Sequence, residues 1–449
     1  MSDHTEWRKN RVYHNEGTTM LEIVEILIPA FYYTVTATVI DSLALQTRKK
    51  QGSTRIYIIE FAIIVLQIIF SMTVLEQYIS IALLLSGLTM FGFLLMVNIL
   101  PEQNKKPPEQ AKIKNFITNA RSTINLMSVI AILAVDFKIF PLRFAKTETV
   151  GVSLMDVGAA LYVYSNGIVA PEVKNKLEPI QDSFKNSLPL FVMGFGRFFL
   201  VKQTDYHVPA MEYGTHWNFF VTLGVVKLFG SMVLKYCQNG ALFAAITVVT
   251  LHEFCLQSGL NQFIFSDIPR TTFLAANREG IYSSFGYLAI YLFSVHFGKI
   301  LLNNDKFNTL KKIFLFTLIT FILTISLSVS TDISRRTANA AFCFWILFLG
   351  SFMTGLFFIY ELYQERYLCN RLTNLVYTPF IYKAINDNAL VFFLIANILT
   401  GLINMCVDTM SLNSLIGLLI VSGYMAVNCL IVCVLSHKKI SVLKIIKLK

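Results

Sequence analysis

AILAVDFKIFPLRFAKTETVG, the stretch Ala131–Gly151, decides how the rest of the chain is interpreted. An uncharged apolar segment, residues 123–135, leads directly into Asp136, and Arg143 and Lys146 follow. An ionised carboxylate at the centre of a bilayer costs roughly 2.5–3.5 kcal/mol on insertion scales. A chain retains such a group where it has a charged partner, a water-filled cavity or a chemical task. The stretch therefore predicts a membrane helix that ends at a functional or ion-paired carboxylate.

Helix geometry places Asp136 near one membrane interface. At about 1.5 Å per residue, a helix over residues 124–140 spans about 25 Å, slightly less than the roughly 30 Å hydrocarbon core. Pro141 prevents a straight helix from continuing, and a turn there would let Lys146 fold back toward Asp136. An interfacial carboxylate that is ion-paired with Arg143 or Lys146, without a chemical role, fits the same residues equally well.

Composition indicates a membrane protein. Of the 449 residues, 55% are hydrophobic and 14% are charged, whereas soluble domains carry about 25% charged residues. The formal charge of +11 does not indicate nucleic acid, because the basic residues flank apolar runs, as is typical of membrane-surface contacts. The seven cysteines show no CxxC spacing and are interpreted as apolar filler, and no metal-ligand spacing is present.

The pattern of apolar runs predicts an all-α polytopic membrane protein with about 13 transmembrane helices. No segment has the pattern of a β-sheet, a P-loop or a GxGxxG turn, and no internal repeat suggests a transporter built from inverted halves. The sixth span is short and the eighth contains His252 and Glu253, which makes these two the weakest. The expected spans are 21–45, 56–75, 78–100, 123–140, 151–170, 188–201, 217–235, 240–258, 283–302, 312–330, 339–362, 389–407 and 413–436.

The distribution of basic residues predicts the orientation. About two thirds of the 38 Lys and Arg residues fall in one set of loops and in the C-terminal tail. The positive-inside rule then places the C-terminus in the cytosol and the N-terminus on the opposite, lumenal side. The polar start of the chain, with charges of both signs, does not look like a cleavable signal peptide. We expect a lumenal N-terminal tail over 1–20, one multi-span membrane domain over 21–437 and a basic cytosolic tail over 438–449.

Four polar and aromatic clusters fall at helix ends on the predicted lumenal side. Together they supply Asp, Lys, His, Glu, Asn and Arg at one membrane face, as a polar-headed substrate and a proton-transfer reaction would need. The clusters are DFKIFPLRFAK at 136–146, EYGTHWNFF at 212–220, AANREGI at 275–281 and DISRRTAN at 332–339.

These clusters, in this order, resemble the PIG-W family, the glucosaminyl-phosphatidylinositol O-acyltransferases of GPI-anchor synthesis. The resemblance covers nearly the whole chain, and further matching motifs are NEGTTMLEI at 15–23, SLMDVGAALYVYSNGIV at 153–169 and FFLIANILTGLINMCVDT at 392–409. The family usually has DFPxFPRRFAK at the first cluster, where this chain carries Lys138 and Leu142. Those departures affect the shape of the loop, because Asp136 and Lys146 are both retained.

The resemblance implies an activity and a location. Family members transfer a long acyl chain, typically palmitoyl from palmitoyl-CoA, to the 2-hydroxyl of inositol in glucosaminyl-phosphatidylinositol. They are thirteen-span proteins of the endoplasmic reticulum membrane with lumenal motif loops. Acyl-CoA is then a co-substrate, and no cofactor, metal or nucleic acid is expected.

By the same resemblance, Asp136 and Lys146 form the catalytic pair. A sugar hydroxyl is a poor nucleophile near neutral pH and needs a base within hydrogen-bond reach. A poorly solvated Asp136 would be a stronger base than a carboxylate in water, and Lys146 could hold it and offset charge on the thioester oxyanion. His216 is the competing base, with a helix-capping role beside Trp217 as the alternative.

The remaining candidates are predicted to bind substrate. The guanidinium fork suits phosphate oxygens, and interfacial snorkelling is the alternative for the arginines. The polar residues could bond sugar hydroxyls, and helix–helix hydrogen bonding is the alternative for the asparagines. Glu22, Glu25, Asn397 and Asn404 are interpreted as structural. The predicted binding residues are Arg143, Asn166, Glu212, Trp217, Asn218, Asn277, Arg278, Glu279, Arg335 and Arg336.

Two other classes of protein remain open. A membrane-bound O-acyltransferase with another acceptor would need an essential histidine within a span, and His252 or His296 could supply it. A lipid or solute transporter would carry polar clusters near mid-membrane on both sides. The one-sided clustering and the matching order of the motifs favour the inositol acyltransferase over both.

Overall fold

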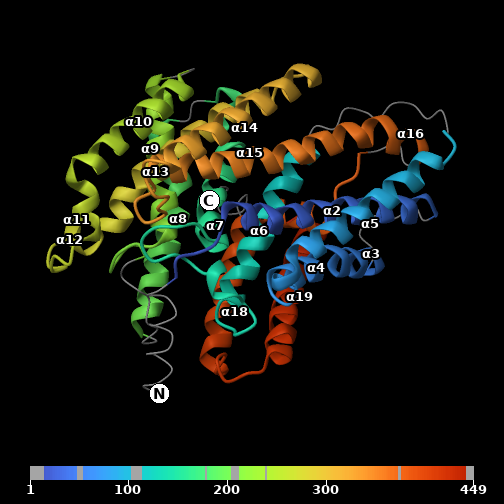
Figure 1. The fold of residues 1–449 in the computed structure, drawn as a ribbon, viewed down its shortest axis with the longest axis horizontal. Coiled ribbons are helices and arrows are strands. Elements are labelled where there is room, and N and C mark those ends of the chain that lie inside the picture. The colour runs from blue at the N-terminus through green and yellow to red at the C-terminus, as the bar shows by residue number, and fades with distance from the viewer. Residues whose placement is uncertain are drawn as a thin grey trace. The chain divides into compact units, whose positions relative to one another are not determined.

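The computed structural model describes residues 15–47, 54–102, 114–176, 179–203, 212–237, 240–372 and 376–440. Within these ranges the structure is helical and contains no strand longer than the isolated bridges of Gly17 and Thr18 to Val152 (Figure 1). The prediction of an all-α fold is therefore confirmed for the described part of the chain. The predicted tails over 1–20 and 438–449 lie mostly outside the described residues.

The chain forms two compact units. The first unit contains residues 1–6, 19–145 and 353–449, and the second contains 7–18 and 146–352. The helices of the first unit are α2 (Met20–Thr47), α3 (Thr54–Glu60), α4 (Gln67–Met72), α5 (Ile79–Ile99), α6 (Asn115–Ala134), α16 (Cys369–Arg371), α17 (Phe380–Asp387), α18 (Ala389–Cys406) and α19 (Ser414–His437). The predicted division into a lumenal tail, one membrane domain and a cytosolic tail stays a prediction.

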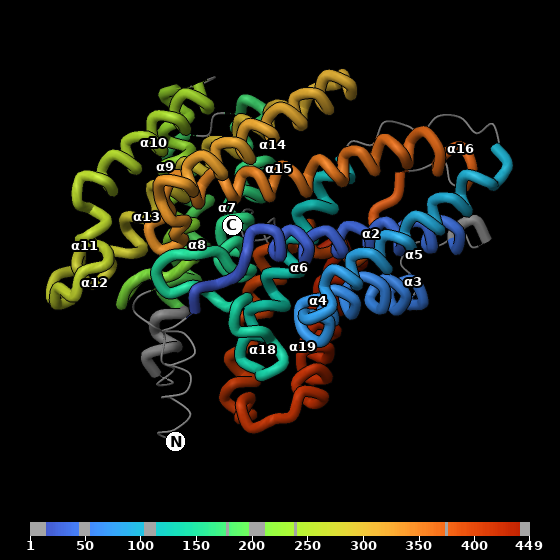
Figure 2. The backbone as a smooth tube through the Cα atoms, in the orientation of Figure 1, coloured from blue at the N-terminus to red at the C-terminus, as the bar shows by residue number. Residues whose placement is uncertain are grey.

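Helix α6 is the most enclosed helix of the first unit. It packs against α17, α18 and α19, and α2 lies alongside α5, as the tube in Figure 2 also shows. Most residues of α6 are apolar. The hydroxyl groups of its Ser122 and Thr123 donate hydrogen bonds to Tyr382 of α17. Because hydroxyl groups inside an apolar bundle need partners, these bonds fix α6 against α17.

Helix α13 (Arg278–Leu301) is the centre of the second unit. It packs against α7, α9, α10 and α14, so nearly all of its side chains are buried. Gly286 allows the segment before α15 to lie close to α13, because a Cβ at that position would lie 2.0 Å from the carbonyl oxygen of Ala338. The other helices of the unit are α7 (Leu154–Gly167), α8 (Ile180–Gln203), α9 (Phe219–Cys237), α10 (Ala241–Cys255), α11 (Asn261–Phe265), α12 (Phe273–Ala276) and α14 (Lys306–Ser328), and α15 (Ala340–Tyr363) continues from this unit into the first.

Eleven helices of the described chain are long and apolar enough to cross a membrane. Each corresponds to one of the thirteen predicted spans, so the chain is a multi-pass membrane protein. The two predicted spans without such a helix are 151–170 and 188–201. Helix α7 has 14 residues, fewer than the roughly 17–25 that a span needs. Helix α8 is longer, but its first half is polar. The count of 13 and the orientation of the termini stay predictions.

One predicted boundary is wrong. The fourth span was expected over 123–140 and to stop at Pro141, but α6 begins at Asn115 and ends at Ala134. The turns that follow place the amide groups of Asp136 and Phe137 on the carbonyl oxygens of Leu133 and Ala134. Asp136 therefore lies in the loop just beyond the helix rather than within its last turns.

Candidate functional site

Asp136 is held by an amide of α18. The Nδ2 group of Asn404 donates a hydrogen bond of 2.7 Å to Oδ2 of Asp136. Asn404, which the sequence suggested was structural, therefore positions the candidate base. Because the two oxygens of a carboxylate carry several lone pairs, a bond from an amide can orient the group and still allow a hydroxyl to donate to it.

Lys146 is paired with another predicted site residue. Its Nζ lies 2.7 Å from Oε2 of Glu212, and both side chains are partly exposed, at 30% and 21%. The carbonyl oxygen of Lys146 also accepts a bond from Asn15, within the NEGTTMLEI motif. The structure thus joins the first two polar clusters through Lys146 and Glu212.

Asp136 belongs to the first unit and Lys146 to the second. Their predicted contact joins residues of different units and stays a prediction. Each residue nevertheless has a defined partner within its own unit, Asn404 and Glu212, respectively.

The backbone at His216 is tied to the third cluster. Asn277 Oδ1 accepts the amide of His216 at 2.8 Å, and the amide of Thr215 donates to the carbonyl of Ala276 at 2.9 Å. Gly214 has φ +122°, and a Cβ there would lie 2.5 Å from Cα of Asn277. The His216 side chain is exposed, and its ring stacks on Phe273.

Three other predicted binding residues are engaged within the fold. Asn218 caps α9 by accepting the amides of Phe220 and Val221. The indole of Trp217 donates to Thr222 at 2.9 Å. Asn166 donates to a carbonyl one turn earlier in α7, at 2.8 Å. These are local bonds within or next to a helix, and the role of the three residues in substrate binding stays a prediction.

Arg335 forms a buried ion pair. Its Nε lies 2.6 Å from Oδ1 of Asp156, and the two side chains are 4% and 1% exposed. Burial favours a lower pKa for the Arg335 guanidinium, but Asp156 together with the neighbouring Tyr213, Tyr287 and Glu212 outweighs it, and the pKa is raised. Asp156 Oδ2 also accepts the amide and the hydroxyl of Thr147. Through Asp156, Arg335 therefore anchors the loop that carries Lys146. A phosphate-binding arginine at the surface would not need such a buried ion pair.

Arg143 is held by two acids of the first unit. Its guanidinium bonds Glu22 at 2.9 Å and also pairs with Glu76. Glu22, which the sequence suggested was structural, thus fixes a predicted binding residue. Two carboxylates on one guanidinium compete with any phosphate, so the predicted phosphate role of Arg143 is not favoured by its surroundings.

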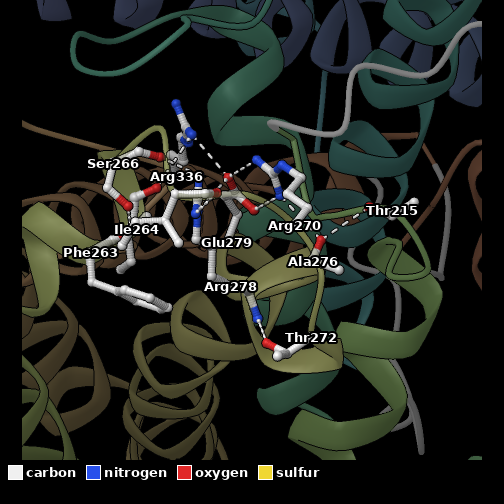
Figure 3. A network of polar contacts seen from close by, with 12 residues as sticks. Thr215, Phe263, Ile264, Ser266, Arg270, Thr272, Ala276, Arg278, Glu279 and Arg336 are labelled. Atoms are coloured by element: carbon white, nitrogen blue, oxygen red, sulfur yellow. Dashed lines mark hydrogen bonds and ion pairs between the residues drawn. The ribbon is translucent and has the colours of Figure 1, made fainter.

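Glu279 is the centre of a cluster of arginines (Figure 3). Its carboxylate accepts two bonds from Arg270, at 2.9 and 2.6 Å, and one from Arg336 at 2.9 Å. Arg278 lies 3.7 Å away and donates to the carbonyl oxygens of Ile268 and Ser266. The bonds to Glu279 raise the pKa of Arg270, and burial lowers the pKa of Arg336. Three guanidinium groups share one buried carboxylate.

Sequence reasoning missed several residues of these networks. Asp156 could have been found, because it is the only charged residue of the apolar helix α7 and follows the capping Ser153. Arg270 lies in the long connection between α11 and α12, where no periodic pattern points to it. His252, the candidate of a His-dependent acyltransferase, is buried, and its Nε2 is bonded to the carbonyl of Thr337 at 2.9 Å.

Comparison with known proteins identifies the family. A family model described as GWT1 matches residues 5–435. The chain therefore belongs to the GWT1 family. It is 32% identical to a Homo sapiens protein named glucosaminyl-phosphatidylinositol-acyltransferase PIGW, over 93% of this chain and 95% of that protein. It is also 34% identical to the GPI-anchored wall transfer protein 1 of Schizosaccharomyces pombe, over 70% of each chain, and 31% identical to that of Candida albicans, over 91% of this chain and 94% of that one.

The family match covers all of the clusters from which the site was built. The four polar clusters and the three further motifs lie within residues 5–435. The resemblance stated from the sequence is thereby confirmed.

Proposed function

We propose that this protein is a GPI-anchor inositol acyltransferase. It moves a long acyl chain, palmitoyl by preference, from acyl-CoA to the inositol 2-hydroxyl of glucosaminyl-phosphatidylinositol in the endoplasmic reticulum membrane. The observation that carries this proposal is the match over 93% of the chain to a relative named for that acyl transfer. The membrane-spanning helices supply the environment that a lipid acceptor needs.

Asp136 is the proposed base. It accepts the proton of the inositol 2-hydroxyl while the hydroxyl oxygen attacks the thioester carbonyl. The bond from the neutral amide of Asn404 supports this role, because it orients the carboxylate without neutralising its charge. Collapse of the tetrahedral intermediate forms the ester and releases the CoA thiolate, which takes up the proton.

Lys146 is proposed to stabilise the oxyanion, and Glu212 to position Lys146. A fixed ammonium stabilises negative charge that develops on the thioester oxygen. The 2.7 Å pair with Glu212 supports this assignment, since it limits the rotation of a flexible side chain. His216 remains the second candidate for the base because its ring is exposed beside the same cluster.

The purified protein in lipid vesicles tests the proposed function. With palmitoyl-CoA and glucosaminyl-phosphatidylinositol, it should form a product that carries one more acyl chain. Phospholipases that attack through the inositol 2-hydroxyl should cleave the acceptor and leave this product intact. A product that stays sensitive to such a phospholipase would mean that the acyl chain is on another hydroxyl, and no product would refute the proposal.

A further inference from the structure

The second unit contains a cavity of about 590 Å³ beside the arginine cluster. Its walls come from residues 148–150, from Asn261 and residues 265–270, and from Arg278 and Arg336, which Figure 3 shows. Small-molecule sites typically have volumes of about 300–1,000 Å³. Glu148 is two residues after Lys146 in the sequence. One wall of the cavity therefore belongs to the same loop as a proposed catalytic residue.

One wall of the cavity is basic and incompletely satisfied. Arg270, Arg278 and Arg336 line it and share the single carboxylate of Glu279, so positive charge exceeds negative charge there. Arg278 and Arg336 are 3% and 5% exposed, and the Nε of each has no hydrogen-bond partner. A buried guanidinium donor without a partner is costly, and an anion in the cavity would satisfy it.

The same cavity also carries negative charge. Glu148 is half-buried and Asp267 is exposed. Neither carboxylate forms an ion pair with another residue of the described chain. A pure phosphate site would avoid such groups, because a carboxylate repels the ligand. The cavity therefore suits a ligand that carries charges of both signs.

We propose that this cavity binds the headgroup of the acceptor lipid, with the phosphodiester at the arginines and the glucosamine ammonium at Glu148 and Asp267. This inference rests on the proposed function. The acceptor headgroup has one phosphodiester, one ammonium group and many hydroxyls, which matches a cavity with both signs of charge. Coenzyme A carries several negative charges and no ammonium group, so it fits the acidic side poorly. Arg270, Glu148 and Asp267 become specificity residues of the reaction.

Binding of the soluble headgroup, glucosaminyl-inositol phosphate, tests the site without any acyl donor. Titration calorimetry on the purified full chain should give about tenfold weaker binding for Arg270→Gln, because one charge-assisted contact is lost. Arg270→Lys should recover part of that loss. Arg371→Gln is the matched control, since it removes an arginine from the ion pair with the 60% exposed Glu102 and should leave binding unchanged.

A second ligand separates the two charges. Glu148→Gln should weaken binding of the glucosaminyl headgroup several-fold. Binding of the glucosyl analogue, which lacks the ammonium group, should stay unchanged. Equal weakening of both analogues, or none, would overturn the assignment of Glu148. If Arg270→Gln weakens binding of palmitoyl-CoA and not of the headgroup, the cavity belongs to the acyl donor, and the proposal is overturned.

The two proposals fail separately. A wild-type protein that binds the headgroup but transfers no acyl chain would refute the proposed function and leave the site standing. A wild-type protein that acylates the acceptor, with the same acceptor KM in Arg270→Gln, would refute the site and leave the function standing.

Discussion

Replacement of Arg335 by alanine should destabilise the protein rather than remove a phosphate contact. The Arg335–Asp156 pair is almost fully buried at 2.6 Å. Removal of one partner of a buried ion pair costs about 3–5 kcal/mol, because the other charge stays buried and uncompensated. For a cooperative unit of the size of the second unit, each kcal/mol shifts the melting temperature by about 2–4 °C. The expected decrease is therefore on the order of 10 °C.

Thermal unfolding in detergent, followed by fluorescence-detected size-exclusion chromatography, measures this decrease. Asp156→Asn should cause a loss of similar size, and the double variant Asp156→Asn with Arg335→Gln should regain at least half of it, since neither partner then carries a charge. Arg55→Ala, at an exposed position of α3, should change the melting temperature little. An Arg335→Ala protein that melts within 2 °C of wild type by this assay but no longer binds acceptor would refute the structural role.

Three further predictions concern catalysis and topology. Glu212→Gln should lower kcat about tenfold with little change in either KM or melting temperature, because the Lys146 pair is partly exposed and contributes little to stability; a changed KM alone would place Glu212 in binding. His216→Ala should retain substantial turnover if its ring only stacks on Phe273, and a folded but inactive variant would move the base to His216. An engineered glycosylation sequon in the N-terminal tail should be modified and one after Lys449 should not, whereas the reverse pattern in a gel-shift assay would invert the predicted orientation.

The broad fold could be predicted because apolar length is a local property of the sequence. Eleven of the expected spans have matching helices for that reason. The early end of α6 could not be predicted, since residues 124–140 contain no helix-breaking residue before Pro141. The helix ends at Ala134, and Asn404, far away in the sequence, bonds Asp136 in the loop that follows.

The candidate site was only partly predictable, for a similar reason. Residue types in the predicted lumenal clusters identified Lys146, Glu212 and two of the arginines around Glu279, Arg278 and Arg336, but not Arg270. Which charges neutralise one another depends on contacts between distant segments, such as Arg335 with Asp156. Arg335 and Arg336 are adjacent in sequence, but one is locked in a buried pair and the other lines a cavity.

The proposed chemistry depends most directly on Asp136, and a single activity comparison tests it. Asp136→Asn keeps the shape of the side chain and its contact with Asn404 but removes the proton acceptor. In vesicles with palmitoyl-CoA and glucosaminyl-phosphatidylinositol, acylated product per folded protein should fall at least about a hundredfold, which is the contribution typical of general base catalysis. Near-normal product formation by a folded Asp136→Asn protein would contradict the assignment of Asp136 as the base.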